Sequence, residues 1–179
     1  MTKDILLIGL TGTNSAGKGK AAAYLQKKSY TYISLSDLIR EELQRDGKDI
    51  SRDNLIKKGN ELRKKYGPDI LARLVMKKVK DKAVIDSIRN PAEVIFLRNQ
   101  KSFILLAIDA PVKLRYERAK KRGRNESASS LKEFMKKEKE EMTISKKGQQ
   151  LHHCMKMADA IIINDGTLEE FYQKLEEWL

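Results

Sequence analysis

Short apolar runs recur along the chain, and segments in which apolar and charged residues follow a helical spacing lie between them. Each run is continuous, as in strands that are covered on both faces of a sheet. The alternation of strands and helices predicts an α/β domain with a five-stranded parallel sheet and helices on both faces. We predict strands over residues 5–10, 30–35, 83–88, 103–108 and 160–163.

Helices are predicted between these runs, and several begin with residues that suit a helix start. Ser130 and Thr167 each precede a glutamate by three positions, and Pro91 and Pro111 suit a first helical turn. The polar stretch 123–130 starts with a glycine and is predicted to be a mobile loop. The predicted helices span residues 18–28, 36–45, 51–66, 69–80, 91–99, 111–122, 130–146 and 167–178.

The composition fits one compact domain in a reducing compartment. The 179 residues, of which 40% are hydrophobic, can bury a single core, so we expect one domain over residues 1–179. Cys154 is the only cysteine, and the first apolar run is too short for a signal peptide or a membrane span. We therefore expect a cytoplasmic protein, either a monomer or a small homo-oligomer.

The chain carries 37 Lys and Arg against 25 Asp and Glu, which gives a formal charge of +12. This excess favours anionic partners such as nucleotides, nucleic acid or acidic lipid headgroups, and it does not choose among them. Basic and acidic residues mix three and four apart over residues 132–141, which is the pattern of a solvated helix face. The choice of partner therefore depends on motifs.

A glycine-rich segment follows the first predicted strand and opens the first predicted helix. It fits the P-loop motif G-x-x-x-x-G-K, with Gly12, Gly17 and Lys18 at the defining positions. In such a loop the N–H groups face phosphate oxygens at a helix N-terminus, and the lysine reaches the β- and γ-phosphates of ATP. The competing interpretation is a glycine turn with an incidental lysine. The predicted ATP contacts are Gly12, Thr13, Asn14, Ser15, Ala16, Gly17, Lys18, Gly19 and Lys20.

The loop departs from the usual motif at the two positions after its lysine. Gly19 and Lys20 stand there, so the hydroxyl that usually contacts Mg²⁺ in P-loop proteins is missing. Thr13 and Ser15 inside the loop, or a carboxylate elsewhere that holds the ion through water, are the available substitutes.

The strings IGLTGTNSAGKG and ADAIIINDGTLEEF are similar to dephospho-coenzyme A kinases, and the glycine after the P-loop lysine resembles adenylate kinases. Nearly the whole chain resembles the nucleoside monophosphate kinase superfamily, including the archaeal relatives of adenylate kinase. The resemblance implies a P-loop NTPase fold, with ATP and Mg²⁺ as cofactors. It also implies a helical acceptor-binding insertion over about residues 36–81 and a lid over about residues 118–146.

Two segments resemble the acceptor side of these families. The string SLSDLIREEL implies a candidate base at Asp37 and an arginine that holds the acceptor's phosphate at Arg40, and ELRKKYGPDILARL makes Arg63 and Arg73 candidates for the same phosphate. The alternatives are local. Ser36 and Asp37 are good helix caps, and the arginines suit a solvated surface.

Three further segments resemble the family's nucleotide contacts. Asp86 and Arg89 follow a strand end, where parallel sheets bind ligands, and the match implies Mg²⁺ held through water by Asp86 and phosphates held by Arg89. Arg118 and Arg122 are one helical turn apart and can converge on a phosphate or on adenine. Gly166 matches the turn around adenine. The alternatives are a helix-capping Asp86, a solvated basic helix end and an ordinary strand-to-helix turn.

The motifs favour an ATP-dependent phosphotransferase that acts on a small phosphorylated acceptor. The acceptor is a nucleoside or deoxynucleoside monophosphate in the favoured hypothesis and dephospho-coenzyme A in the alternative. A hypothesis of another class is an ATP-regulated module that binds nucleic acid or protein; the 6% aromatic residues do not interleave with the basic runs, so nucleic acid is not favoured. A zinc site at His152, His153 and Cys154 is not expected, because no second Cys/His pair completes it.

Overall fold

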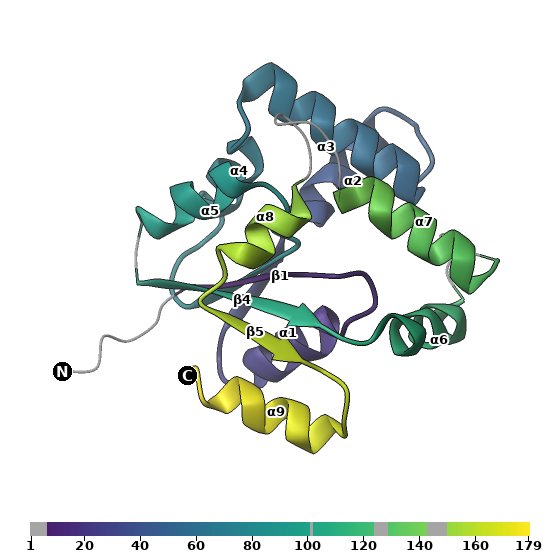
Figure 1. The fold of residues 1–179 in the computed structure, drawn as a ribbon. Helices are drawn as coiled ribbons and strands as arrows, with labels where there is room; N and C mark the ends of the chain where they lie inside the picture. The colour runs from purple at the N-terminus through teal and green to yellow at the C-terminus, as the bar shows by residue number, and fades with distance from the viewer. Residues whose placement is uncertain (1–6, 101, 124–128, 143–149) are drawn as a thin grey trace.

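Five strands form one parallel sheet in the centre of the molecule (Figure 1). The computed structural model describes residues 7–100, 102–123, 129–142 and 150–179. The strands are β1 (Leu7–Gly12), β2 (Thr31–Ser34), β3 (Ala83–Asp86), β4 (Phe103–Asp109) and β5 (Ala160–Ile163). Their order across the sheet is β2-β3-β1-β4-β5, and every neighbouring pair is parallel. The predicted sheet is therefore confirmed.

Four strands end at places that differ from the prediction: β4 by one residue, at Asp109, and the other three for local reasons. β1 continues to Gly12 because its ladder with β4 runs as far as the pair Gly12 and Ile108. β2 ends at Ser34 because Leu35 already begins a helix. β3 ends at Asp86, and Ser87 after it has a φ of +66°, which turns the chain away from the sheet. Residues 5–6 of the first predicted strand lie outside the described residues.

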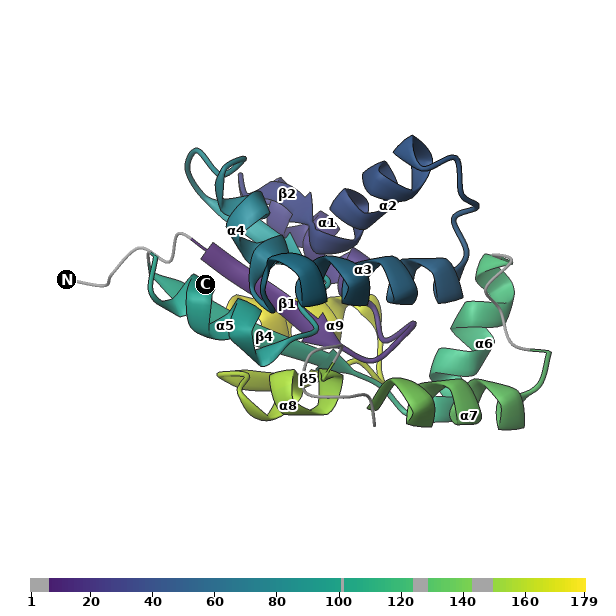
Figure 2. The ribbon, with the colours of Figure 1, turned by 90° about the horizontal axis from the view of Figure 1, so that it is seen from above.

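Helices cover both faces of the sheet, as predicted (Figures 1 and 2). The helices are α1 (Lys18–Lys27), α2 (Leu35–Arg45), α3 (Arg52–Tyr66), α4 (Ile70–Met76), α5 (Pro91–Arg98), α6 (Val112–Arg122), α7 (Leu131–Met142), α8 (Leu151–Lys156) and α9 (Leu168–Glu176). α1 and α9 pack on one face, and α2, α5 and α8 pack on the other. α3 lies against α2 and α4, and α6 lies against α7.

Each face of the sheet has its own hydrophobic cluster, because successive side chains of a strand point to opposite faces. Leu7 of β1 lies in the cluster under α2, α4, α5 and α8. Ile8 and Leu10 lie in the cluster under α1 and α9, together with Ala16 of the P-loop and Leu25 of α1. This second cluster supports the P-loop and the helix that follows it.

The predicted helix starts at Ser130 and Thr167 are confirmed. Each hydroxyl accepts a hydrogen bond from the backbone N–H three residues ahead, at 3.2 Å in both cases. Pro91 is the first residue of α5, whose cap is Asn90, and Asn90 forms a reciprocal capping box with Glu93. The role of Glu93 at this helix start was not predicted.

Two helices differ from the prediction. α4 is shorter than the predicted helix 69–80. α8 was not predicted, because only Leu151 and Cys154 of its six residues are buried, and two buried positions are too few to show a helical period. The predicted mobile loop 123–130 and helix 130–146 fall partly on residues 124–128 and 143–146, which lie outside the described residues. Within the described part of the chain, none of the helices has the length and apolar character needed to cross a membrane.

Candidate active site

Two glycines of the P-loop have backbone conformations that side chains disfavour. Gly12 has a φ of +130°, and a Cβ there would lie 1.9 Å from the carbonyl oxygen of Ile108. Gly17 has a φ of +115°, and a Cβ there would lie 2.3 Å from Nδ2 of Asn164. A side chain at either position would be strained and would collide with β4 or with the loop after β5. Both motif glycines are therefore required by the path of the loop.

Lys18 begins α1, and its side chain turns back along the loop. Its Nζ donates hydrogen bonds to the carbonyl oxygens of Gly12 and Thr13, at 2.9 and 2.8 Å. The loop is also held by Asn164, whose Nδ2 donates to the carbonyl oxygen of Ala16 at 2.8 Å. A positive side chain thus lies beside the N-terminus of a helix, where the helix dipole also favours an anion.

Arginines on α6 reach the same loop. Arg118 donates to the carbonyl oxygens of Ala16 and Asn164, at 3.3 and 3.1 Å, and Arg122 donates to Oγ of Ser15 at 3.1 Å. Burial lowers the pKa of Arg118, although a guanidinium stays charged at neutral pH. The structure therefore brings both predicted arginines to the P-loop.

A third arginine joins α6 to α7 and to the P-loop. The buried Arg115 forms an ion pair with Glu138 of α7, at 2.8 Å between Nη1 and Oε1. The same side chain donates to the carbonyl oxygen of Asn14 at 3.4 Å. α7 and the end of α6 belong to the segment 118–146 that was predicted to be a lid, and Arg115, which precedes this segment, joins α7 to the P-loop.

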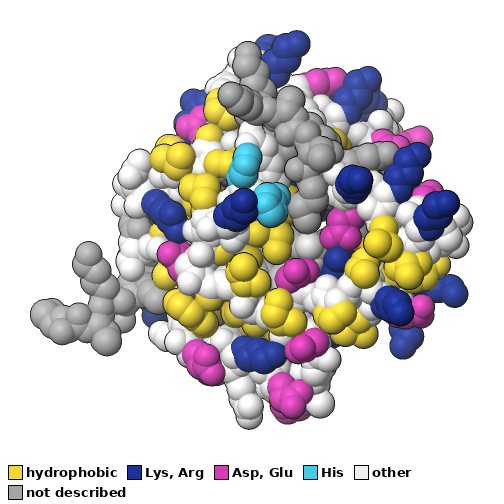
Figure 3. Space-filling model, in the orientation of Figure 1, with side chains coloured by type: hydrophobic (Ala, Val, Ile, Leu, Met, Phe, Trp, Pro, Cys, Tyr) yellow, Lys and Arg dark blue, Asp and Glu magenta, His cyan; other side chains and the backbone are white. Residues whose placement is uncertain are grey.

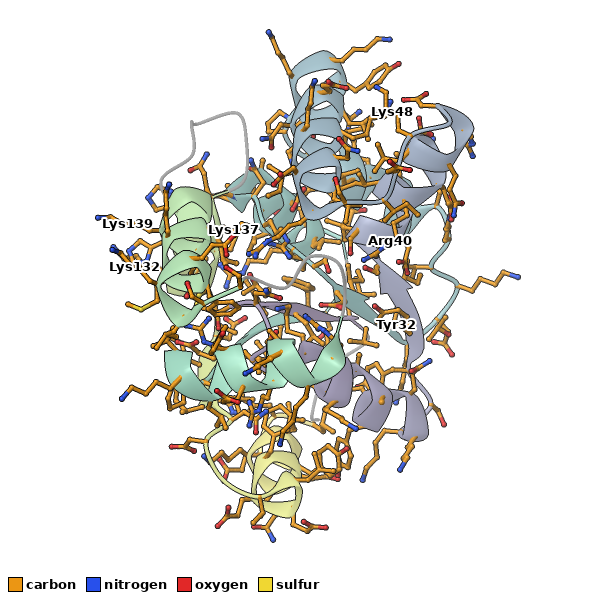
Figure 4. All side chains as sticks on the ribbon, turned by 90° about the vertical axis from the view of Figure 1, so that its right-hand side faces the viewer. Tyr32, Arg40, Lys48, Lys132, Lys137 and Lys139 are labelled. Atoms are coloured by element: carbon orange, nitrogen blue, oxygen red, sulfur yellow. The ribbon has the colours of Figure 1, made fainter. Side chains whose placement is uncertain are left out.

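A cleft of about 1090 Å³ runs along the carboxyl edge of the sheet from the P-loop to α2 and α3. Figure 4 shows Tyr32 and Arg40 on one side of the molecule's centre and Lys132, Lys137 and Lys139 of α7 on the other. The P-loop residues that line the cleft are Asn14, Ser15, Gly17, Lys18, Gly19 and Lys20. The other three predicted contacts, Gly12, Thr13 and Ala16, are buried behind them and do not line it.

The far end of the cleft contains the predicted acceptor residues that follow β2 and β3. Asp37 and Arg40 both line the cleft, and they form an ion pair with 2.8 Å between Oδ1 and Nη1. The carboxylate of Asp37 is 53% exposed. Arg89 also lines the cleft. The sheet thus brings side chains that are distant in sequence to one edge.

The two candidates from the third and fourth helices have different surroundings. Arg63 is buried, lines the cleft and is paired with Glu93. Arg73 does not line the cleft: its guanidinium bonds the carbonyl oxygen of Tyr66 and pairs with Asp69 at 3.2 Å. The structure does not bring Arg73 to the other acceptor residues, because α4 directs it outward onto the turn before the helix.

Comparisons with known proteins give the family. The AAA domain family model matches residues 11–135. A UPF0200 protein of Sulfurisphaera tokodaii is 33% identical over 177 residues, which cover 98% of this chain and 96% of that protein. A UPF0200 protein of Pyrococcus horikoshii is 34% identical over 182 residues, which cover 97% of this chain and 94% of that protein. The chain belongs to the AAA domain family and to the UPF0200 proteins.

A solved structure shows the fold class. The shikimate kinase of Bacteroides thetaiotaomicron superimposes with a TM-score of 0.59 and 16% identity, over 97% of each chain. At this identity the likeness concerns the fold alone. The UPF0200 chain has the P-loop kinase fold, and the predicted fold class is confirmed.

Asp86 of the UPF0200 chain fits a metal held through water. Its Oδ1 accepts the N–H of Ser87 at 2.6 Å, and its Oδ2 accepts the hydroxyl of Tyr32 at 3.2 Å. Each oxygen retains a lone pair that can accept from a water molecule on Mg²⁺. The loop hydroxyls fit less well, because Thr13 donates to Asp109 away from the cleft and Ser15 accepts from Arg122.

We expect the phenol of Tyr32 to ionise near pH 12. Burial is the larger cause and the negative charge of Asp86 the smaller, and together they raise its pKa from 10.0 to about 12. At neutral pH the hydroxyl is therefore protonated and donates to Asp86. The ultraviolet pH titration of the protein minus that of Tyr32→Phe isolates this group. A midpoint near 10 would contradict the assigned environment, provided that circular dichroism shows a folded protein at each pH.

His152, His153 and Cys154 do not form a metal site in the described part of the UPF0200 chain, where no three histidine, cysteine or acidic side chains converge. Both histidines are exposed on α8, on the face that Figure 3 shows. Cys154 points into the core, and burial raises the pKa of its thiol, so the thiolate that binds zinc is disfavoured.

Several residues that shape the site were missed because their roles depend on contacts distant in sequence. Tyr32 meets Asp86 across 54 positions, and Glu93 meets Arg63 across 30. Asn164 was noted only as part of a turn, yet its amide holds the P-loop. The available signal for Asn164 was its place directly after a predicted strand; Tyr32 lies three residues before the carboxyl end of the predicted strand 30–35 and gave no such signal.

Proposed function

We propose that this UPF0200 chain is an ATP-dependent phosphotransferase that moves the γ-phosphoryl group to a nucleoside or deoxynucleoside monophosphate. The observation that carries this proposal is the single cleft with the P-loop at one end and Arg40, Arg63 and Arg89 at the other. Anion-binding groups at both ends of one cleft suit a donor and an acceptor that both carry phosphate.

The residues around the cleft suit the charge demands of phosphoryl transfer. Lys18 and the N–H groups of the P-loop would bind the donor's β- and γ-phosphates, and Arg118 and Arg122 lie close enough to neutralise charge on the transferred group. Asp86 would hold Mg²⁺ through water, and the ion would supply charge neutralisation between the phosphates. By the family resemblance, Arg89 would contact phosphates of both donor and acceptor.

The acceptor half of the cleft also has an apolar wall. Ile39 of α2 and Leu55 and Ile56 of α3 line it together with the arginines. Such a wall suits the flat face of a nucleobase, and the arginines suit the phosphate of the same molecule. We therefore propose residues 36–81, which contain most of α2 and all of α3 and α4, as the acceptor-binding region. On the family resemblance we also propose residues 118–146 as the lid.

Dephospho-coenzyme A is the alternative acceptor, because it also carries adenine and phosphate. Transfer to its ribose hydroxyl would require a base, and Asp37 lines the cleft with an exposed carboxylate. A nucleoside monophosphate has an ionised phosphate at neutral pH and needs no such base.

Replacing Asp37 with asparagine separates the two acceptors. For a nucleoside monophosphate we expect kcat to change by less than about tenfold, since no proton is removed by the enzyme. A fall in kcat of about 10²-fold or more with an unchanged acceptor KM would instead identify a general base and favour a hydroxyl acceptor. Steady-state kinetics with the variant measure both constants. Arg45→Lys, at an exposed ion pair on the same helix, is the matched control.

The experiment that tests the proposed function is an ADP-release screen with ATP and Mg²⁺. The acceptors are the ribo- and deoxynucleoside monophosphates and dephospho-coenzyme A. Release above the ATP-only rate with one or more monophosphates supports the proposal, and release with dephospho-coenzyme A alone supports the alternative. If no acceptor raises the rate, a salt-dependent mobility shift on RNA and DNA tests the binding-module hypothesis.

A further inference from the structure

A buried ion pair lies where the acceptor half of the cleft meets the core. Nε and Nη2 of Arg63 both donate to Oε1 of Glu93, at 2.9 and 2.7 Å. The two side chains are 1% and 0% exposed. Because one side of the guanidinium is committed to Glu93, the plane and direction of the other side are fixed.

The second carboxylate oxygen of Glu93 holds the loop after β3. Oε2 accepts the backbone N–H groups of Arg89 and Asn90, at 3.0 Å each. The carbonyl oxygen of Arg89 accepts the N–H of Gln150 at 2.7 Å, so the loop is held from both sides. One carboxylate therefore fixes the side chain of Arg63 and the backbone that carries Arg89.

The remaining nitrogen of Arg63 is the unusual feature. Nη1 is buried and has no hydrogen-bond partner among the described residues, although Arg63 lines the cleft. A buried donor without a partner destabilises the folded state, and a buried ion pair seldom stabilises more than an apolar pair of the same size. Stability alone therefore does not explain why this ion pair is present. A ligand oxygen that accepts a hydrogen bond from Nη1 would explain it, because it would supply the missing partner.

We propose that Glu93 is a positioning residue that holds Arg63 so that its Nη1 donates to an anionic oxygen of the acceptor. The inference rests on the proposed function, because it concerns the acceptor half of the same cleft. Glu93 neutralises the charge of Arg63, so Nη1 supplies a directed hydrogen bond without a net positive charge. An acceptor that lacks an oxygen at this point would leave the donor unsatisfied and would bind weakly.

The test uses a double variant that separates a positioning role from a structural one. Glu93→Gln alone leaves a buried guanidinium without its counterion and is expected to lower the melting temperature. Arg63→Gln/Glu93→Gln removes both charges, so most of the melting temperature should return. We expect the acceptor KM of the double variant to stay about tenfold or more above wild type, with the KM for ATP unchanged.

Arg63→Lys gives an independent and milder test. The ammonium keeps the charge and can bind Glu93, but it has no second nitrogen in a fixed fork to offer to the cleft. We expect a rise in acceptor KM of about tenfold at a nearly unchanged melting temperature. Arg45→Lys makes the same chemical change at an exposed pair with Glu42 and should match wild type.

A binding measurement tests the inference without turnover. With the P-loop saturated by ADP and Mg²⁺, sulfate is titrated at constant ionic strength and its dissociation constant is read from the melting temperature. We expect weaker sulfate binding by about tenfold in Arg63→Lys and in the double variant, and no change in Arg45→Lys. Sulfate affinity and acceptor KM at wild-type values in the double variant would overturn the role of Glu93. An inactive wild type that still shows the sulfate difference would overturn the proposed function alone.

Discussion

Lys18→Ala is expected to lower phosphotransferase turnover by about 10²-fold or more, because it removes one preorganised positive group from the donor phosphates. The side chain lines the cleft and donates to two carbonyl oxygens of its own loop, so the melting temperature should change little. Turnover is measured by ADP release with the acceptor that the screen identifies. Lys27→Ala, at an exposed position near the end of the same helix, is the control.

The outcome that contradicts this prediction is wild-type turnover in folded Lys18→Ala protein. In that case the loop would not bind the donor, and the glycines would be explained by chain geometry alone. A loss of activity that follows a lower melting temperature would be equally against it, because the prediction requires the fold to be intact.

Gly12→Ala is expected to destabilise the protein by about 3 kcal/mol or more. The new Cβ would meet the backbone of Ile108 in β4, which cannot move without opening the ladder between β1 and β4. The φ of +130° adds backbone strain. Equilibrium unfolding in urea measures the change.

Gly19→Ala is the matched control within the same loop. A Cβ at Gly19 would meet no atom within 4 Å, and the residue lies in the first turn of α1 with an ordinary φ. Alanine there should leave the free energy of unfolding within about 1 kcal/mol of wild type and on the stabilising side. Equal losses from the two substitutions would show that the left-handed turn at Gly12 is not as described.

The sheet and most helices could be predicted from the sequence because their signals are local. A continuous apolar run such as 103–108 is required of a strand with helices on both faces, and that run became β4 almost unchanged. α8 could not be predicted in this way. Its six residues bury only Leu151 and Cys154, and its position is set by packing on β1 and α5.

The donor end of the site was predictable for the same reason. Gly12, Gly17 and Lys18 are close in sequence, and the turn that they form dictates their spacing. The acceptor end depends on pairs that only the folded chain brings together. Arg63 was a candidate on resemblance alone, and no role was predicted for its partner Glu93. Arg73 was a candidate on the same resemblance, yet its helix turns it away from the cleft.

The separation of the two hydrophobic clusters has a consequence for how related enzymes diverge. The P-loop and α1 rest on the cluster that includes Ile8 and Leu25, whereas α2 and α4 belong to the other cluster, across the sheet. Substitutions at Ile39 or Leu55 would reshape the apolar wall and disturb only the cluster under α2 and α4. Under the proposed function, single substitutions there would change acceptor preference and leave the cluster that supports the P-loop intact.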